Sequence, residues 1–544
     1  MEHSRVTILI LSLMISIFQL QLHSSHAIPN QDVSYMKFVH NATDLPPKEE
    51  YDYIIIGGGT AGCPLATTLS SKFSVLLLER GSDPNKYPSV LDEQGLLNVF
   101  AAGDDGRNPF QRFVSEDGVE NIRGRVLGGG SMVNAGFYSR GHREFFASAG
   151  VDWDMELVEK AYEWVEETVV SQPILNAWQS AFRSSLLEGG VVPDNGFDLR
   201  HLVGTKTGGS IFDNKGNRHG AVELLNKANP TNIKVAIEAT VQRILFSGLS
   251  ANGVLYSDSK GKLHRAIIRK KGEIIVSAGA IGSPQLLLLS GIGPKSHLSS
   301  LKLPVVLHQP YVGQSMSDNP RFGTNIIIPF PVLPSSVKVV GILQDNIYIQ
   351  SIASPFPILI PQIFSLLPPQ ATSIIPTLAM FVGKFSEVHS EGSLRLNSST
   401  NVKKSPIVGF NYYSHPDDLG RCVKGVRKMG DLLKTRTMEK IKTKNLEGNK
   451  GFEFLGVPLP ENLWNDSSVE EYCKKTVTTY WHYHGGCLVG KVVDGNYKVI
   501  GIKNLRVVDG STFSESPGTN PMATLMMLGR YVGLKLLHQR SNLK

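Results

Sequence analysis

The sequence predicts an α/β fold organised around a Rossmann-type dinucleotide-binding domain. Three observations lead to this prediction. The chain has 544 residues, enough for about two to four domain-sized units. Near residue 50 it reads as strand, glycine turn, helix and strand, which is the order of a nucleotide-binding unit. Further glycine clusters follow short apolar runs near residues 128, 279 and 510, where turns at strand ends are expected.

The first 27 residues have the pattern of a secretory signal peptide. His3 and Arg5 precede an apolar run over residues 6–20, and Ser25 and Ala27 match the small-x-small pattern of a cleavage site. The alternative, a membrane anchor, would need an apolar run of ~20 residues. We therefore expect cleavage, no stable membrane insertion afterwards, and a secretory-pathway protein with an extracellular, cell-wall or vacuolar location. Three glycosylation motifs fit this route, at Asn41, Asn397 and Asn465.

The charge of the chain argues against a nucleic-acid partner. The formal net charge is +7, and no dense tract of Lys or Arg is present. The short run RKKGE at residues 269–273 reads as a solvated strand end. We expect a small-molecule substrate instead.

The stretch YDYIIIGGGTAGCPLATTLSSKFSVLLLERG, at residues 51–81, predicts a dinucleotide site. Gly57 makes the tight turn, Gly59 lets the backbone approach a pyrophosphate, and Gly62 allows close packing of helix and strand. The helix that follows offers free N–H groups to the phosphates. Glu79 ends the second strand, 22 residues after Gly57, where an acidic residue accepts hydrogen bonds from a ribose. The motif itself leaves FAD and NAD open.

Three later segments are candidates for further cofactor contacts. GRVLGGGSMVNAGFYSRG, at residues 124–141, has successive glycines that let backbone lie against a planar ring or a phosphate; an ordinary flexible loop is the alternative. GEIIVSAGAIGSPQLLLLSGIGP, at residues 272–294, reads as strand, turn and a helix that starts at Ser283-Pro284. NLRVVDGSTFSESPGTNPMATLMMLGRYVG, at residues 504–533, reads as strand, turn and a helix that starts at Asn520-Pro521.

Together these segments resemble the glucose–methanol–choline (GMC) family of FAD-dependent oxidoreductases. RVLGGGSMVN is similar to the first family signature and GAIGSPQLLLLSGIG to the second. The resemblance covers nearly all of the mature chain and is greatest to the plant mandelonitrile-lyase-like group, which is secreted and glycosylated. It implies a Rossmann-type FAD-binding domain interleaved with a substrate-binding domain that has a large antiparallel sheet. The FAD-binding segments would be residues 45–145, 220–315 and 485–544, and the substrate-binding segments residues 146–219 and 316–484.

The resemblance also implies which residues meet the FAD. It places there Gly57, Gly59, Thr60, Ala61, Gly62, Glu79, Arg125, Gly128, Gly129, Gly130, Ser131, Asn134, Val241, Trp481, His482, Asp509, Gly510, Asn520 and Pro521. The Gly124–Gly141 loop contains no histidine or cysteine, so we expect FAD to be bound non-covalently. The protein is expected to be a monomer.

The stretch TTYWHYHGGC, at residues 478–487, holds two histidines. In the family the catalytic histidine precedes a glycine by three positions and often a cysteine by five, which implies that His482 is catalytic. His484 is then structural or a secondary wall of the pocket. A zinc site formed by His482, His484 and Cys487 is the metal alternative, but it lacks a fourth ligand at recognisable spacing, so no metal is expected. The predicted substrate pocket includes Tyr480, Trp481 and His484.

The expected function is oxidation of a small, aromatic alcohol to an aldehyde. His482 would accept the hydroxyl proton near neutral pH while FAD takes the hydride, and Asn520 would donate a hydrogen bond to the developing alkoxide. The alternative is (R)-mandelonitrile lyase chemistry, in which a cyanohydrin is split into aldehyde and cyanide and FAD is a scaffold. Those lyases have a second histidine where this chain has Asn520, and a pocket cysteine that the segment Asn346–Ser351 lacks. Asparagine cannot exchange a proton near neutrality.

Four cysteines remain after signal cleavage, and they allow three full pairings. Cys63 lies in the cofactor turn and Cys487 follows the histidines, which leaves Cys422 and Cys473 as the best structural pair. The resemblance supports the same disulfide. Residues 351–382 are apolar and contain six prolines, which prevent a regular membrane helix. We expect this segment to form walls of the substrate domain or a cover over the pocket.

Overall fold

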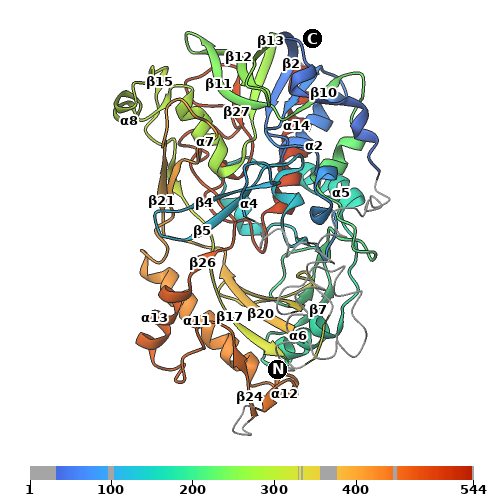
Figure 1. Cartoon of the computed structure of the whole chain (residues 1–544), viewed down its shortest axis with the longest axis vertical. Helices are drawn as coiled ribbons and strands as arrows, with labels where there is room; N and C mark the ends of the chain where they lie inside the picture. Colours follow the sequence, from blue (N-terminus) through green and yellow to red (C-terminus); the bar gives the residue numbers. More distant parts are fainter. Residues whose placement is uncertain are drawn as a thin grey trace, which may run out of the picture. The chain divides into compact units, whose positions relative to one another are not determined.

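Two eight-stranded sheets organise the chain (Figure 1). A computed structural model describes residues 32–95, 103–328, 330–332, 335–355, 377–444 and 450–541. The predicted signal peptide, residues 1–27, lies outside the described residues, as does most of the proline-rich segment 351–382.

The first sheet is mostly parallel. Its strands follow the order β1 (Val39–Asn41), β10 (Ile233–Ile237), β3 (Val75–Leu78), β2 (Lys48–Ile56), β13 (Leu263–Val276), β12 (Ser250–Ser257) and β11 (Thr240–Ser247), and β27 (Leu505–Val507) also pairs with β13. The antiparallel pairs of this sheet, among the described residues, are β11–β12 and β12–β13. The run at 75–78 is buried at every position, as expected for a parallel strand covered on both faces. The predicted Rossmann-type arrangement is confirmed.

Helices pack on both faces of this sheet. Alternate residues such as Ile55 and Leu77 share one core with α2 (Gly62–Ser70), α5 (Met155–Val169) and α14 (Met522–Ser541). Their neighbours Ile54 and Leu76 share a second core with α7 (Gly279–Leu289). The side-chain period of two in a strand explains this division.

Helix α7 begins earlier than the sequence predicted. It starts at Gly279 instead of Ser283-Pro284 and holds Pro284 in its interior. The N–H of Gly279 donates to the Asp509 carboxylate at 2.9 Å, so a residue far along the chain stabilises this helix N-terminus. A purely local reading could not include that carboxylate.

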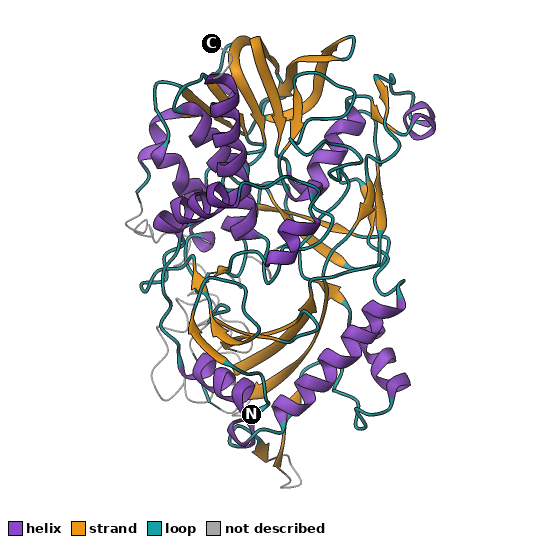
Figure 2. Ribbon diagram, turned by 180° about the vertical axis from the view of Figure 1, so that it is seen from behind, coloured by secondary structure: helices purple, strands orange, loops and turns teal. Residues whose placement is uncertain are grey.

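The second sheet is antiparallel except for the pair β7–β8. Its order is β25 (Glu453–Phe454), β17 (Pro320–Ile328), β20 (Thr377–Phe385), β19 (Ile347–Pro355), β18 (Val339–Ile342), β8 (Gly204–Thr207) and β7 (Asp194–Phe197), and β26 (Thr478–Thr479) pairs with β17. One face contributes Phe322, Ile349 and Phe381 to a core with residues of α6 (Ala177–Glu188) and α11 (Pro416–Leu433). Figure 2 shows this curved sheet with helices beside it. The predicted large antiparallel sheet is therefore present.

The remaining elements lie before or between the strands and helices given above. They are η1 (Ser34–Phe38), η2 (Ala42–Asp44), η3 (Pro84–Lys86), η4 (Pro88–Val90), β4 (Phe110–Val114), β5 (Glu120–Gly124), η5 (Gly129–Met132), β6 (Phe137–Tyr138), α4 (Arg143–Ser148), β9 (Gly209–Ser210), η6 (Ala221–Lys227), β14 (Ile292–Gly293), α8 (Lys295–Ser300), β15 (Leu307–His308), β16 (Gln314–Met316), β21 (Gly392–Arg395), β22 (Ile407–Gly409), α12 (Arg436–Glu439), β23 (Thr443–Lys444), β24 (Lys450–Gly451), α13 (Asp466–Thr476) and η7 (Gly510–Thr512).

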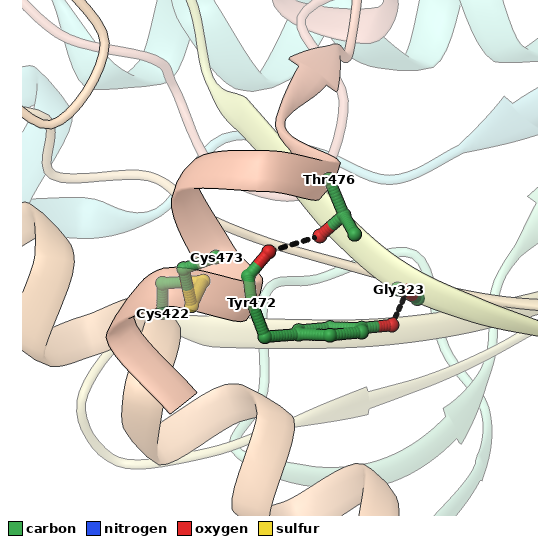
Figure 3. Close-up of a disulfide and its surroundings, with 5 residues drawn as sticks. All are labelled: Gly323, Cys422, Tyr472, Cys473 and Thr476. Atoms are coloured by element: carbon green, nitrogen blue, oxygen red, sulfur yellow. Dashed lines mark hydrogen bonds between the residues drawn. A yellow bond between two sulfur atoms is a disulfide. The ribbon is translucent and has the colours of Figure 1, made fainter. Parts of the chain in front are cut away.

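The predicted disulfide joins α11 to α13 (Figure 3). Cys422 and Cys473 are both fully buried, and Cys63 and Cys487 are free and buried. The hydroxyl of Tyr472 donates to the carbonyl of Gly323 in β17 at 2.5 Å. Helix α13 is therefore fixed both to α11 and to the second sheet, directly before the stretch that contains the two histidines.

The glycosylation motifs differ in their surroundings. Asn397 and Asn465 are exposed. The Nδ2 atom of Asn41 donates to Glu238 at 2.8 Å, and its Oδ1 atom accepts from the Thr43 N–H at 3.0 Å. Among the described residues, no helix has the length and apolar character needed to cross a bilayer.

Candidate active site

A cavity of about 1550 Å³ lies between the carboxyl ends of the parallel strands and one face of the second sheet. Ile56 and Leu78 line it from the ends of β2 and β3, and Gln350, Met380 and Val382 line it from β19 and β20. Open α/β sheets bind ligands at this edge. The volume exceeds the ~300–1,000 Å³ of a typical small-molecule site, so there is room for a dinucleotide and a substrate.

Glycine loops form the dinucleotide wall of the cavity. A Cβ at Gly129 would lie 2.7 Å from the Cα of Gly59, and a Cβ at Gly57 would lie 2.3 Å from the carbonyl oxygen of Ser277. Three glycine segments distant in sequence thus meet backbone to backbone. Because no side chain intervenes, a pyrophosphate and a planar ring can approach the backbone N–H groups. This wall fits the FAD that the resemblance implies.

Two buried carboxylates hold these loops in place. Glu79, which follows β3, accepts from the N–H of Gly58 at 2.9 Å. Asp509 accepts from the N–H of Gly279 at 2.9 Å and from the hydroxyl of Ser283 at 2.5 Å. Burial raises the pKa of both carboxyl groups, and these hydrogen bonds oppose the shift. Each carboxylate ties a glycine turn to the end of a strand.

Most residues expected at the FAD line the cavity. They are Gly57, Gly59, Thr60, Ala61, Glu79, Arg125, Gly129, Gly130, Ser131, Asn134, Val241, Trp481, His482, Asp509, Gly510, Asn520 and Pro521. Gly62 and Gly128 lie behind this wall. A Cβ at Gly62 would be 2.0 Å from the carbonyl oxygen of Gly57, and the N–H of Gly128 donates to Gly58 at 2.7 Å. These two glycines shape the loops.

His482 and Asn520 lie together in the opposite wall. The Nε2 atom of His482 is 3.2 Å from Nδ2 of Asn520. Its Nδ1 atom is 3.1 Å from Oδ1 of Asn319. Asn319 must present its oxygen to the ring, because its Nδ2 donates to the carbonyl of Phe385 at 2.6 Å. We therefore assign the ring proton to Nδ1, which leaves the Nε2 lone pair directed at the cavity.

A fully buried lysine lies behind His482. The Nζ atom of Lys384 donates to Gly518 at 2.7 Å and to Asn319 at 3.1 Å. It also reaches the hydroxyl of Ser516 at 3.5 Å, so each ammonium proton has an acceptor. The same Nζ atom is 3.2 Å from Nδ1 of His482.

The electrostatics of this wall keep His482 neutral. Burial, the Lys384 charge and the nearby His484 hold the pKa of His482 well below its ordinary value. Burial also lowers the pKa of Lys384 well below its ordinary range, while the Asp318 carboxylate opposes that shift. A neutral imidazole that carries no proton on Nε2 is the form that can accept one there.

A chain of hydrogen bonds orients Asn520. The hydroxyl of Tyr480 donates to Oε1 of Gln350 at 2.5 Å. The Nε2 atom of Gln350 then donates to Oδ1 of Asn520 at 3.4 Å. With its oxygen engaged by Gln350, Asn520 presents its NH₂ group to His482.

Asp318 anchors the backbone of the stretch that contains His482 and His484. It accepts from the N–H of His482 at 2.8 Å. It also accepts from the hydroxyls of Tyr412 at 2.6 Å and Thr479 at 2.7 Å. Burial raises the pKa of Asp318 to about 6. This carboxylate holds the stretch against the start of β17.

His484 does not line the cavity. It is 2% exposed, and its Nδ1 atom lies 3.0 Å from the carbonyl oxygen of His482. Burial lowers its pKa to about 4. Its backbone forms an isolated bridge with Ser317. The other two predicted pocket residues, Tyr480 and Trp481, do line the cavity.

The metal alternative at this stretch lacks the required geometry. Within the described ranges, the group of potential metal-ligand atoms that lie within 4.8 Å of one another is His389, His415 and Asp417. His482, His484 and Cys487 do not form such a group.

Several residues of the catalytic wall were not predicted from the sequence. They are Asp318, Asn319, Arg321, Gln350 and Lys384. Lys384 interrupts the apolar run of β20, FVGKF, and it is completely buried. A cation inside an apolar strand was the available signal, since buried lysine is rare without a specific partner. The glutamine and asparagine carry no comparable signal.

Comparisons with known proteins agree with this geometry. A GMC oxidoreductase profile matches residues 51–321, and a second one matches residues 388–529. (R)-mandelonitrile lyase 1 of Prunus serotina is 52% identical over 548 residues, covering 99% of this chain and 97% of the relative. Sinalpyl alcohol oxidase Nec3 of Nesocodon mauritianus is 50% identical over 539 residues, covering 97% of each chain.

Solved structures show the same fold at low sequence identity. A formate oxidase structure has a TM-score of 0.75 and 19% identity, covering 92% of this chain and 100% of the other. Three findings indicate the same cofactor: the two family profiles, the long alignments with relatives and the glycine wall. The protein is a flavin enzyme with FAD as its cofactor. The chain belongs to the GMC family of FAD-dependent oxidoreductases.

Proposed function

We propose that this enzyme oxidises a small aromatic alcohol to the aldehyde, with His482 as the base. The observation that carries the proposal is the His482–Asn520 pair. Its Nε2–Nδ2 distance is 3.2 Å, and both residues face the cavity that the glycine wall also lines. A hydroxyl oxygen placed beside both groups meets a proton acceptor and a hydrogen-bond donor at once.

The two residues have different roles in the reaction. His482 accepts the hydroxyl proton at Nε2, because Nδ1 already carries a proton held by Asn319. Asn520 donates to the substrate oxygen as negative charge develops there, a contribution worth about 2.7–4 kcal/mol at comparable sites. FAD, when bound, would supply the acceptor for the hydride of the carbinol carbon.

The residues of the glycine wall would hold the FAD without a covalent bond. The loop at 124–141 contains no histidine or cysteine for such a bond. We propose that residues 45–145, 220–315 and 485–544 form the FAD-binding domain and that residues 146–219 and 316–484 form the substrate domain. Apart from β1, the strands of the first sheet fall in the former segments, and those of the second sheet fall in the latter.

An aromatic substrate fits the remaining space. Tyr480, Trp481, Ile352, Met380 and Val382 line the cavity. The relative from Nesocodon is named for an alcohol oxidase activity, which supports the same reaction class. The signal-peptide pattern and the Cys422–Cys473 disulfide support secretion, since disulfides persist in oxidising compartments.

Cyanohydrin cleavage is the second candidate. Relatives at 49–52% identity are named (R)-mandelonitrile lyases, and His482 could equally accept the hydroxyl proton of a cyanohydrin. Such a lyase must also return a proton to the leaving cyanide. Asn520, which neighbours the base, cannot supply one, so the local chemistry favours oxidation.

Anaerobic mixing separates the two functions. The purified enzyme is mixed with an aromatic alcohol or with mandelonitrile, and flavin absorbance, aldehyde and cyanide are measured. Oxidation bleaches the flavin with the alcohol; cleavage releases aldehyde and cyanide while the flavin stays yellow. Asn520→His is the informative variant, because a second histidine should raise cyanide release from a low level. Cyanide release by the wild type without any flavin reduction by alcohols would overturn the proposal.

A further inference from the structure

Arg321 is a cation in the cavity wall, and no acidic partner for it is found among the described residues. It is the second residue of β17 and lines the cavity. Burial lowers its pKa, and the group that opposes this shift is Tyr480, which is not a carboxylate. Its guanidinium lies 5.8 Å from the Trp481 ring centre.

The segment between β19 and β20 does not contain an acidic residue either. Residues 356–376 include neither Asp nor Glu. Once FAD and substrate fill the cavity, a guanidinium is costly there unless an oxygen atom accepts its hydrogen bonds. The substrate is therefore the natural source of that acceptor.

The position of Arg321 relative to the base follows from the strand. Asn319, whose oxygen touches His482, precedes Arg321 by two residues, so their side chains are about 7 Å apart along one face. Phe322 pairs with Gly383 across the sheet, which makes Lys384 the next neighbour of Arg321 on the cavity face. His482, which contacts Asn319, and Arg321 thus face the same cavity at positions offset along the direction of β17.

The wall beside Arg321 is apolar. Ile352, Met380 and Val382 line the same cavity. An aromatic ring can occupy this surface, with one oxygen at His482 and another at Arg321. A para-substituted benzyl alcohol carries its two oxygen atoms at opposite ends of one ring, a separation comparable with the strand spacing.

We propose that the substrate is an aromatic alcohol with an oxygen substituent on the ring opposite the carbinol, and that Arg321 binds this oxygen. The inference rests on the proposed function for the identity of the reacting group. The substrate atom that Arg321 binds is an oxygen that accepts hydrogen bonds. It belongs either to a neutral phenolic hydroxyl or to an anionic phenolate or carboxylate. Guanidinium donors suit each of these.

A substrate series tests the inference on the wild type alone. The series is benzyl alcohol, 4-methylbenzyl alcohol, 4-hydroxybenzyl alcohol and 4-(hydroxymethyl)benzoate, measured by anaerobic flavin reduction. The two oxygenated alcohols, or one of them, should exceed the methyl analogue in kcat/KM by roughly 10- to 100-fold, as expected for a hydrogen bond to a charged group. Preference for the carboxylate would identify the acceptor as anionic. Equal kcat/KM for methyl and oxygenated substrates would overturn the inference.

Two variants then assign the preference to Arg321. Arg321→Met removes the charge and should abolish the discrimination, so that 4-hydroxybenzyl and 4-methylbenzyl alcohol react with equal kcat/KM. Arg321→Lys keeps a charge and should restore part of it. An equal loss for all substrates in Arg321→Met, with discrimination unchanged, would show that the residue has no such role.

Binding of the product aldehydes separates this inference from the proposed function. The dissociation constants of 4-hydroxybenzaldehyde and 4-methylbenzaldehyde are read from the perturbation of the flavin spectrum, so no turnover is needed. Tighter binding of the hydroxylated aldehyde, lost in Arg321→Met, supports the inference even if alcohols are not oxidised. Equal binding of both aldehydes by the wild type would contradict it even if oxidation occurs.

Discussion

The two walls of the cavity are built in opposite ways. The dinucleotide wall is made of backbone, at Gly57, Gly59 and Gly129. A Cβ atom would not fit at Gly57 or at Gly129, because other main-chain atoms lie too close. The catalytic wall is made of long side chains, since His482, Asn520 and Lys384 meet through polar tips. The first wall tolerates almost no side-chain addition, whereas the second depends on the identity of every side chain.

This difference separates binding from chemistry. Changes to the glycine wall should remove the FAD and, with it, every activity. Changes to the catalytic wall should leave the FAD in place and alter proton transfer, the pH at which it occurs, or the preference among substrates. Each prediction below tests whether the two walls are independent in this sense.

The largest expected effect comes from adding one methyl group to the glycine wall. Gly57 has φ +106°, and a Cβ there would lie 2.3 Å from the Ser277 carbonyl oxygen. Gly57→Ala should purify with little or no FAD, which the ratio of flavin to protein absorbance measures. Gly118→Ala is the matched control, because Gly118 also has positive φ (+76°) but no atom within 4 Å of the added Cβ. A fully yellow Gly57→Ala protein would contradict the backbone model of this wall.

The next effect concerns the base itself. His482→Ala should slow anaerobic flavin reduction by about 10²–10⁴-fold, because the proton acceptor is lost, while the FAD content stays at the wild-type level. His484→Ala is the control and should cost much less, since His484 does not line the cavity. The assignment of the base fails if His484→Ala is the inactive variant and His482→Ala turns over normally.

The two walls also differ in how well the sequence predicts them. Gly57, Gly59 and Glu79 lie within one short stretch, so local spacing was enough to place them on a turn between strand and helix. Asp509 accepts a hydrogen bond from the N–H of Gly279, which lies 230 residues earlier in the chain. Helix α7 starts at Gly279 instead of at the predicted Ser283-Pro284. Local patterns specify turns, but they do not show which distant carboxylate completes them.

The catalytic wall was only half predictable. The family pattern, with Gly485 and Cys487 at the expected spacing, points to His482, and the same resemblance points to Asn520. Asn319 and Lys384 reach His482 from β17 and β20, and nothing near residue 482 indicates them. Such contacts arise from the register of the second sheet, which the sequence pattern alone does not fix.

The third prediction concerns the charge behind the base. The Lys384 ammonium group lowers the pKa of His482, so its removal should raise that pKa. A base must be unprotonated to act, so with His482 as the proposed base the acid limb of kcat/KM should move to higher pH in Lys384→Met. If the limb moves by about one pH unit, kcat/KM at a fixed pH on that limb falls roughly tenfold. A pH profile of flavin reduction measures it.

Another buried lysine provides the control for that experiment. Lys206 in β8 is also fully buried, and it donates to the hydroxyl of Ser139 at 3.0 Å. Lys206→Met should lower stability without moving the acid limb. If Lys206→Met and Lys384→Met shift the acid limb of kcat/KM equally, the shift comes from a change in the whole sheet and not from loss of the charge beside His482.

The smallest effect on chemistry is expected from the disulfide, which lies outside both walls. Cys422 and Cys473 are 51 residues apart in sequence, and α13 carries the chain directly to the catalytic stretch. The chain-entropy estimate for a loop of this length is roughly 4 kcal/mol, so the double variant Cys422→Ser/Cys473→Ser should show a clear fall in Tm. Its FAD content and its flavin reduction at 25 °C should change little, because Tyr472 and Asp318 still hold α13 and the stretch against β17. A large loss of flavin reduction with normal FAD content would instead show that the covalent link, and not these hydrogen bonds, positions His482.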